Sequence, residues 1–123
     1  MPYNDFVSVT IVTYNSGRFI ERCLESVLDQ KYSRKEIIVV DNNSPDGTID
    51  ILEQFADRCR VIYNTENIGF AGAQNQAIRN SNGEWILTRN PDVLLMPGFI
   101  QALVDAGEID SSVGTICGKL LTI

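Results

Sequence analysis

Polar residues that can bind a phosphorylated ligand gather in four short segments of this chain. These segments are residues 13–17, 41–47, 64–70 and 89–92. Their side chains offer carboxylate and amide oxygens for hydrogen bonds or for a divalent cation, and aromatic faces for a planar base. The four segments together predict a polar ligand site that is assembled from loops.

Apolar patterns on either side of these loops predict the elements that position them. Residues 6–12 are rich in β-branched residues, which fits a buried strand. Residues 37–40 are four β-branched residues in a row without alternation, which is typical of a strand covered on both faces. Two shorter strands are predicted at 61–63 and 85–88, and a last β-rich stretch at 113–123. Helical spacing and capping signals predict helices at 18–29, at 72–80, at 99–106, and from Ser44 or Thr48 onward, the last carrying Ile49, Leu52 and Phe55.

The alternation of strands and helices predicts one α/β domain over residues 1–123, with a mainly parallel, Rossmann-like sheet flanked by helices. In such sheets ligands bind beyond the carboxyl ends of the strands. Because the four polar segments follow the four predicted strands, we expect them to meet at that edge.

Composition narrows the class of ligand. The chain has 123 residues, with 16 acids against 10 bases and a formal charge of -6, so no basic stripe is present to hold a nucleic acid. An acidic protein that binds a diphosphate needs a metal ion or helix N-termini to offset the repulsion. Without a basic leader or an apolar run of membrane-spanning length, a cytoplasmic protein is expected.

Cysteine usage favours a core role. Cys23, Cys59 and Cys117 are odd in number and widely separated, so they predict neither a disulfide framework nor a zinc site. We expect them to be small core residues.

Several nucleotide-binding classes lack their motifs here. The loop after the first predicted strand contains neither G-x-G-x-x-G nor G-x-x-x-x-G-K-[ST]. A receiver domain would have acidic residues at that point, where this chain has Thr13-Tyr14-Asn15, and a sugar nucleotidyltransferase would have a glycine-rich basic loop. These classes are therefore disfavoured.

Five strings of the sequence match, in order and spacing, those of one enzyme family. They are VTIVTYN at 9–15, IVVDNNSPDGT at 38–48, NIGFAGAQN at 67–75, GEWIL at 83–87 and NPD at 90–92. On these strings the chain resembles glycosyltransferase family 2 with its GT-A fold, over residues 7 to about 121. The resemblance implies the nucleotide-sugar-binding, N-terminal part of a longer, truncated enzyme.

The resemblance implies that the donor's base and ribose are held by the loop with Thr13, Tyr14 and Asn15 and by Asp41. A strand-end carboxylate can accept the imide hydrogen of uracil or thymine, and a tyrosine can pack on the base. Two alternatives stay open: Asp41 merely caps a turn, and Tyr14 merely covers the edge of the core. Asn43 stands where many relatives carry an acid or a glycine, and either contacts ribose or forms an Asx-turn.

The third loop supplies further candidates. The resemblance places Asn67 and the following helix start near the nucleotide, and Gly69 allows close backbone approach. Asn75 matches a recurrent asparagine of the family, but Gln74 replaces the arginine that relatives often carry before it. Arg79 and Arg89 remain as candidate cations.

The resemblance places Asn90-Pro91-Asp92 at the Asp-x-Asp motif, which holds a divalent metal on the donor diphosphate. Asp92 can supply a hard oxygen ligand to Mg²⁺ or Mn²⁺, whereas Asn90 offers only a neutral carbonyl oxygen. Members with this variant resemble rhamnosyltransferases, which favours a UDP- or dTDP-sugar donor. The alternative is a simple turn after a strand.

The implied reaction is inverting transfer to a saccharide or lipid-linked acceptor in polysaccharide or cell-envelope synthesis, with peripheral association at the inner face of the membrane. The catalytic base is expected beyond Ile123, because Glu108 and Asp110 resemble solvated loop acids. Self-association through the edge of the C-terminal β-rich stretch is also expected. The alternative function is a non-catalytic nucleotide- or carbohydrate-binding module of the same fold.

Overall fold

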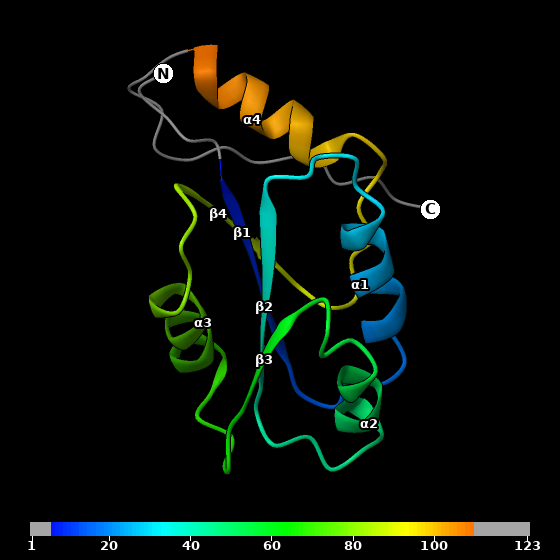
Figure 1. Ribbon diagram of the computed structural model, residues 1–123. Helices are drawn as coiled ribbons and strands as arrows, with labels where there is room; N and C mark the ends of the chain where they lie inside the picture. Colours follow the sequence, from blue (N-terminus) through cyan, green and yellow to red (C-terminus); the bar gives the residue numbers. More distant parts are fainter. Residues whose placement is uncertain (1–5, 110–123) are drawn as a thin grey trace.

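A four-stranded parallel sheet forms the centre of the computed structural model, which describes residues 6–109. The strands are β1 (Val7–Thr13), β2 (Lys35–Asp41), β3 (Arg60–Tyr63) and β4 (Trp85–Arg89), and they lie in the order β3-β2-β1-β4 (Figure 1). Each strand pairs in parallel with its neighbour. The predicted parallel α/β sheet is confirmed.

Helices cover both faces of this sheet. They are α1 (Ile20–Leu28), α2 (Thr48–Glu53), α3 (Phe70–Arg79) and α4 (Phe99–Ile109). Figure 1 shows α3 on the opposite side of the sheet from α1 and α2. Residues of α1, α2 and α4 share one apolar cluster, and α3 contributes to a second.

The two clusters explain why the central strands are buried on both faces. In β1, Val9 and Ile11 are fully buried in the cluster that includes α1, whereas Val12 packs with Ala73 and Ala77 of α3. Fully burying a valine or isoleucine side chain contributes about 1.5–3 kcal/mol. Burial on both faces of the strand therefore stabilises the fold. The predicted core role of Cys23 and Cys59 is confirmed as well, because both are buried.

Some predicted boundaries were wrong. Helix α3 begins at Phe70 rather than residue 72, because Gly69, at φ 86°, turns the chain into the helix at that point. Helix α4 extends to Ile109, so Glu108 is helical and not a loop acid. The predicted β-rich stretch at 113–123, its self-association edge, Asp110 and Cys117 lie outside the described residues.

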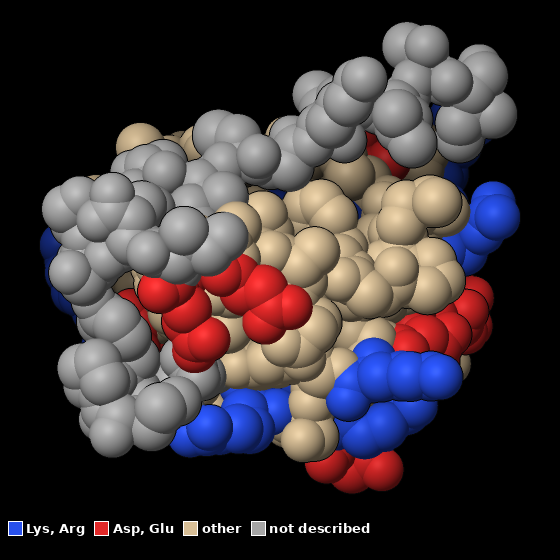
Figure 2. Space-filling model, turned by 90° about the horizontal axis from the view of Figure 1, so that it is seen from above, with Lys and Arg blue, Asp and Glu red and all other residues tan. Residues whose placement is uncertain are grey.

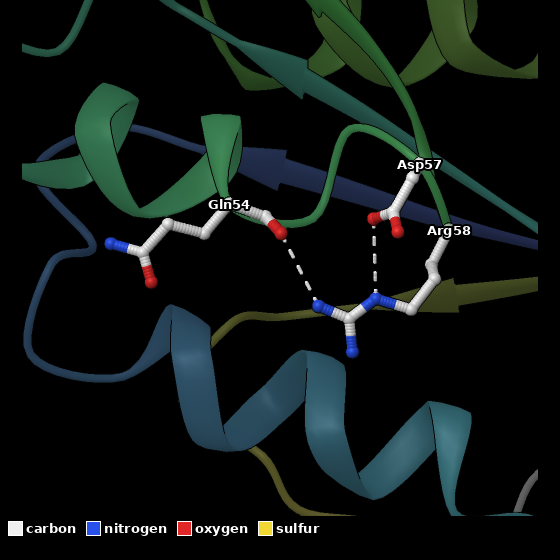
Figure 3. Close-up of polar contacts among 3 residues, drawn as sticks. All are labelled: Gln54, Asp57 and Arg58. Carbon is white, nitrogen blue, oxygen red and sulfur yellow. Dashed lines mark hydrogen bonds and ion pairs between the residues drawn. The ribbon is translucent and has the colours of Figure 1, made fainter.

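Phe55 lies beyond the helix in which it was predicted. Helix α2 ends at Glu53, yet Phe55 stays buried in the core at 4% exposure. The Arg58 guanidinium lies 4.6 Å from the centre of the Phe55 ring. It also donates to the Gln54 carbonyl at 3.2 Å and pairs with the Asp57 carboxylate at 3.4 Å (Figure 3). Because this pair is solvent-exposed, it contributes little stability, and the buried ring fixes the segment.

Hydrogen bonds of polar side chains join β1, β2 and the loop before β4 at the end of the sheet where these strands begin. The buried Ser8 hydroxyl donates to Glu36 Oε2 at 2.5 Å and accepts from the Gly83 amide at 2.7 Å. The Asn82 amide donates to the same carboxylate oxygen at 2.6 Å. Figure 2 views this end of the molecule: among the described residues, an acidic group lies inside the outline beside an uncharged surface, and basic and further acidic side chains lie at the lower and right margins. The ligand loops lie at the other end.

Candidate nucleotide-sugar site

The loops after β1 and β2 are tied together by hydrogen bonds. The Asn15 amide donates to Ser44 Oγ at 3.0 Å, the Ser16 amide to Thr48 Oγ1 at 2.9 Å, and the Gly17 amide to Asp46 Oδ2 at 3.2 Å. All three donors are backbone groups that a loop would otherwise leave to water. The two loops therefore form one preorganised wall.

A cavity of about 530 Å³ opens between the loops at the carboxyl ends of the strands. Its size suits a small-molecule ligand. Six predicted site residues line it: Tyr14, Asn15, Asn67, Gly69, Asn90 and Asp92. The other lining residues are Val12, Ser16, Phe19, Asn42, Phe70 and Pro91. The loops after all four strands contribute, as expected for the edge where parallel strands end.

Thr13 and Asp41 are not among the lining residues. They pair across β1 and β2, both are fully buried, and the Thr13 hydroxyl donates to Asp41 Oδ1 at 2.7 Å. Ser44 donates to the same carboxylate through its hydroxyl at 2.7 Å and its amide at 2.9 Å. The structure thus gives Asp41 the turn-capping position. Through Ser44 it also fixes the backbone of Asn15.

Asn42 was missed by the sequence reasoning. Its side chain is 2% exposed and lines the cavity. The amide nitrogen donates to the Gly69 carbonyl at 3.1 Å, and the amide oxygen accepts from Asn64 Nδ2 at 3.1 Å and from the Ile68 amide at 3.3 Å. Asn42 therefore joins the second loop to the third.

Asn43 and Asn75 also lie away from the cavity. Asn43 is exposed and adopts φ 65°, a left-handed conformation that asparagine tolerates in turns. Asn75 is exposed within α3. Its neighbour Gln74 is buried and donates to the Thr10 hydroxyl, so this side chain packs on the sheet.

Neither candidate arginine lines the cavity. Arg79 is in the last turn of α3, toward the end where the strands begin. Arg89 is 5% exposed and donates to the Val93 carbonyl, which clamps the turn through residues 90–92. Burial lowers the pKa of this guanidinium, while Cys23 and Asp92 oppose the shift. The buried Arg89 side chain thus stabilises the turn through residues 90–92 from outside the cavity.

Asn90 and Asp92 fit a divalent cation that is shared with a diphosphate. Both side chains are exposed and line the same cavity, and they provide an amide and a carboxylate oxygen. Within residues 6–109, no group of three or more His, Cys, Asp or Glu side chains could form a complete metal site. Mg²⁺ is commonly held by one or two carboxylates plus substrate phosphates, so two protein ligands suffice only when the diphosphate is bound.

Three aromatic side chains surround the opening. Tyr14, Phe19 and Phe70 all line the cavity and are 47%, 44% and 58% exposed. Large exposed aromatic faces are unusual away from binding sites, and they provide stacking surfaces for a planar base. Amide groups beside them supply hydrogen-bonding partners for hydroxyls.

An open parallel sheet whose strand-end loops enclose an aromatic and amide-lined cavity, with an oxygen pair for a metal, defines a nucleotide-sugar-binding domain of the GT-A type. The chain belongs to glycosyl transferase family 2, whose family model matches residues 8–119. The family and fold predictions are thereby confirmed.

A relative named for teichuronic acid biosynthesis is among the matches. TuaG of Bacillus subtilis (strain 168), named for a glycosyltransferase of teichuronic acid biosynthesis, is 39% identical over 93 residues. The match covers 73% of this chain and 37% of TuaG. The chain therefore spans about a third of the length of such curated relatives.

Two solved structures extend the comparison to ligands. Residues 1–349 of S. aureus TarS, in complex with UDP-GlcNAc, align with a TM-score of 0.78 and 26% identity, over 85% of this chain and 31% of TarS. Mannosyltransferase PcManGT from Pyrobaculum calidifontis, in complex with GDP-Man and Mn²⁺, aligns with a TM-score of 0.77 and 32% identity, over 88% of this chain and 33% of PcManGT.

Across residues 6–109 of this chain, no helix has the length and apolar character to cross a bilayer.

Proposed function

We propose that this chain binds the nucleotide diphosphate of a UDP- or dTDP-sugar with Mg²⁺ or Mn²⁺, as the donor part of an inverting glycosyltransferase. The observation that carries the proposal is the joint presence of Tyr14, Asn67 and Asp92 in the wall of one cavity. These residues suit, in turn, a base, a ribose and a metal-bound diphosphate. The structures of TarS with UDP-GlcNAc and of PcManGT with GDP-Man and Mn²⁺ support it.

The nucleoside is held by the first three loops. The Tyr14 ring packs on the base, and the exposed Asn67 amide hydrogen-bonds to a base edge or a ribose hydroxyl. Asn42, whose amide already bonds to Asn64, Ile68 and Gly69, holds the loops around the nucleoside. Gly69 lacks a side chain where the backbone meets the ligand. Thr13 and Asp41 act from behind the wall, because their bonds with Ser44 and each other fix the loop that presents Tyr14.

The diphosphate lies toward the fourth loop. Asp92 and Asn90 hold the cation, and Arg89 keeps their turn in place through its bond to Val93. When bound, the metal offsets the charge that develops on the departing diphosphate. Since Asp92 is the one carboxylate that lines the cavity among the described residues, the chain alone has weak affinity for the metal.

Transfer itself is proposed for a longer enzyme with a saccharide or lipid-linked acceptor in polysaccharide or cell-envelope synthesis, at the inner face of the membrane. The name of TuaG, which refers to teichuronic acid biosynthesis, supports polysaccharide synthesis as the setting. The Asn-Pro-Asp motif, which resembles that of rhamnosyltransferases, favours a dTDP-deoxyhexose within the donor class. The reaction needs a base on the acceptor side, and no second carboxylate of the described residues lines the cavity.

Calorimetric titration tests the donor site. UDP, dTDP, GDP and ADP are titrated with and without Mn²⁺ into the wild-type chain, Asp92→Ala and the control Asp29→Ala, which removes an exposed acid at the far end of α1. We expect metal-dependent binding of UDP or dTDP that is lost in Asp92→Ala and kept in the control. Binding of no nucleotide, or equal binding in both variants, would contradict the proposal.

A second titration tests the metal ligands directly. Asn90→Asp restores a second carboxylate beside Asp92 and should increase the affinity for Mn²⁺ measured without nucleotide. Asn43→Asp adds the same charge at an exposed position that does not line the cavity. Equal Mn²⁺ affinity of the two variants would show that Asn90 is not beside the metal.

The absence of a second lining carboxylate among residues 6–109 also favours the alternative of a non-catalytic binding module. The two functions differ in turnover. Release of UDP from a UDP-sugar in the presence of saccharide acceptors, measured for the complete polypeptide, supports the transferase, and tight donor binding without release supports the module.

A further inference from the structure

A second cavity adjoins the proposed donor site. It has a volume of about 380 Å³ and is lined by Arg18, Phe19, Arg22, Pro91, Asp92 and Leu94. Phe19, Pro91 and Asp92 line both cavities and therefore form the partition between them. A ligand in the second cavity would lie beside the occupant of the first.

Two arginines give this second cavity a positive charge in an otherwise acidic chain. Arg18 is in the turn before α1 and Arg22 is in its first turn, and both are exposed. Within residues 6–109, neither guanidinium is within ion-pair distance of a carboxylate. The Arg18 guanidinium lies 5.7 Å from the centre of the Phe19 ring. The like charges of Arg18 and Arg22 in one cavity repel each other, so an anion placed between them is favoured.

We propose that this cavity binds a saccharide through its phosphate or carboxylate group. The saccharide rests on the proposed transferase function, whereas the anion rests only on Arg18 and Arg22. A guanidinium matches the geometry of both oxyanions, with paired charge-assisted hydrogen bonds. Phe19 and Leu94, 44% and 48% exposed, offer an apolar wall for the C–H face of a sugar ring. The site therefore selects anionic over neutral saccharides.

Asp92 couples the two cavities. This residue lines both, so its negative charge repels an anionic saccharide while no cation is bound. A divalent cation at Asp92 removes that repulsion. Binding of UDP with Mn²⁺ should accordingly strengthen binding of the anionic saccharide, and the effect must be reciprocal.

Calorimetry with the 123-residue chain tests this site. The probes are glucose 6-phosphate, glucuronic acid, glucose and inorganic phosphate, each with and without UDP and Mn²⁺. In the variant Arg18→Gln/Arg22→Gln, we expect the affinity for the two anionic sugars to fall by about tenfold to a hundredfold, as for one or two lost charge-assisted bonds. UDP affinity should stay within about twofold, since neither arginine lines the donor cavity.

A matched control separates local from overall charge. Arg34→Gln/Arg79→Gln removes the same two charges near the end of the sheet where the strands begin, from two exposed residues. It should leave the anionic sugars' affinity within about twofold. Arg18→Lys/Arg22→Lys, which keeps the charge, should retain part of the affinity, and circular dichroism checks that each variant is folded.

Each contrary outcome has a distinct meaning. Unchanged sugar affinity in Arg18→Gln/Arg22→Gln overturns the second site while leaving the donor site intact. An equal loss of UDP affinity would show that the arginines hold the donor diphosphate, which also overturns it. Inorganic phosphate binding as tightly as glucose 6-phosphate would overturn recognition of the sugar. Sugar binding that depends on Arg18 and Arg22, without binding of any nucleotide, would support the second cavity and contradict the proposed donor function.

Discussion

Replacement of Asp41 by asparagine separates a positioning role from direct contact with the nucleotide. Both carboxylate oxygens are engaged inside the protein: Oδ1 accepts from the hydroxyls of Thr13 and Ser44, and Oδ2 accepts from the Ser44 amide. In Asp41→Asn one oxygen becomes an NH₂ group that cannot accept. Even in the better orientation, the amide nitrogen must replace Oδ2, and the bond from the Ser44 amide is lost.

The magnitude follows from that one bond. A hydrogen bond to a buried charged group contributes about 1.5–3 kcal/mol, and the Ser44 amide has no water to replace it because the residue is only 5% exposed. For a chain of this size, about 4 °C of Tm corresponds to each kcal/mol. We therefore expect Asp41→Asn to lower Tm by about 6–12 °C, and Thr13→Val by about half as much.

Thermal unfolding and calorimetry on the same samples check the reasoning. If Asp41 acts from behind the cavity wall, folded Asp41→Asn still binds nucleotide, with an affinity reduced by no more than about tenfold through the shifted Asn15 loop. Asp29→Asn, an exposed residue at the C-terminus of α1, is the control and should change neither quantity. An unchanged Tm together with complete loss of nucleotide binding would refute the positioning role and place the carboxylate on the ligand.

Four further predictions test other parts of the structure. Gly83→Ala should destabilise the chain by about 1–3 kcal/mol in urea unfolding, because the new Cβ would lie 2.5 Å from Ser8 N and Oγ. Burial raises the pKa of Glu36, but hydrogen bonds from Ser8 and Asn82 and the charge of Arg60 outweigh burial and hold this pKa below the ordinary value. The stability that the ionised Glu36 contributes is present at neutral pH and is lost as the pH falls through the lowered pKa. Acid should therefore lower the Tm of the wild type more than that of Glu36→Gln. Burial raises the pKa of Cys59 to about 11, so iodoacetamide at pH 8 should alkylate it about a hundredfold more slowly in native than in unfolded protein. Tyr14→Ala should weaken UDP binding by about tenfold in calorimetry and leave Tm nearly unchanged, because the ring is 47% exposed.

The sheet was predictable chiefly from β2, whose central residues have no polar face. Four consecutive β-branched residues at 37–40 require apolar cover on both sides, and the structure provides it through α1 and α2 on one face and α3 on the other. The loops were equally predictable, since polar turn residues follow each strand. The edge at which they meet follows from the parallel order alone.

The roles of Asp41 and Asn42 were harder to predict, because they depend on the direction of two adjacent side chains. Along β2, Ile37 and Val39 belong to the cluster with α1, and Ile38 and Val40 to the cluster with α3. Alternation therefore directs Asp41 toward the first face and Asn42 toward the loop that precedes α3. This signal was present in the sequence. The identity of the groups that bond to Asp41 was not, because Thr13 pairs with it from 28 residues away.

Two positions near the proposed diphosphate bear on its charge balance. The resemblance drawn from the sequence motifs implies that Asn90 takes the position of an acid of the Asp-x-Asp motif, and Gln74 that of an arginine. Gln74 is turned into the sheet, where it donates to Thr10, so its side chain offers no replacement contact to a phosphate. On this proposal one negative and one positive group are missing, so neither the metal nor the diphosphate would have a strong site of its own. Each would depend on the other, and Asp92, which lines both cavities, would be the residue through which donor, metal and an anionic saccharide act on one another.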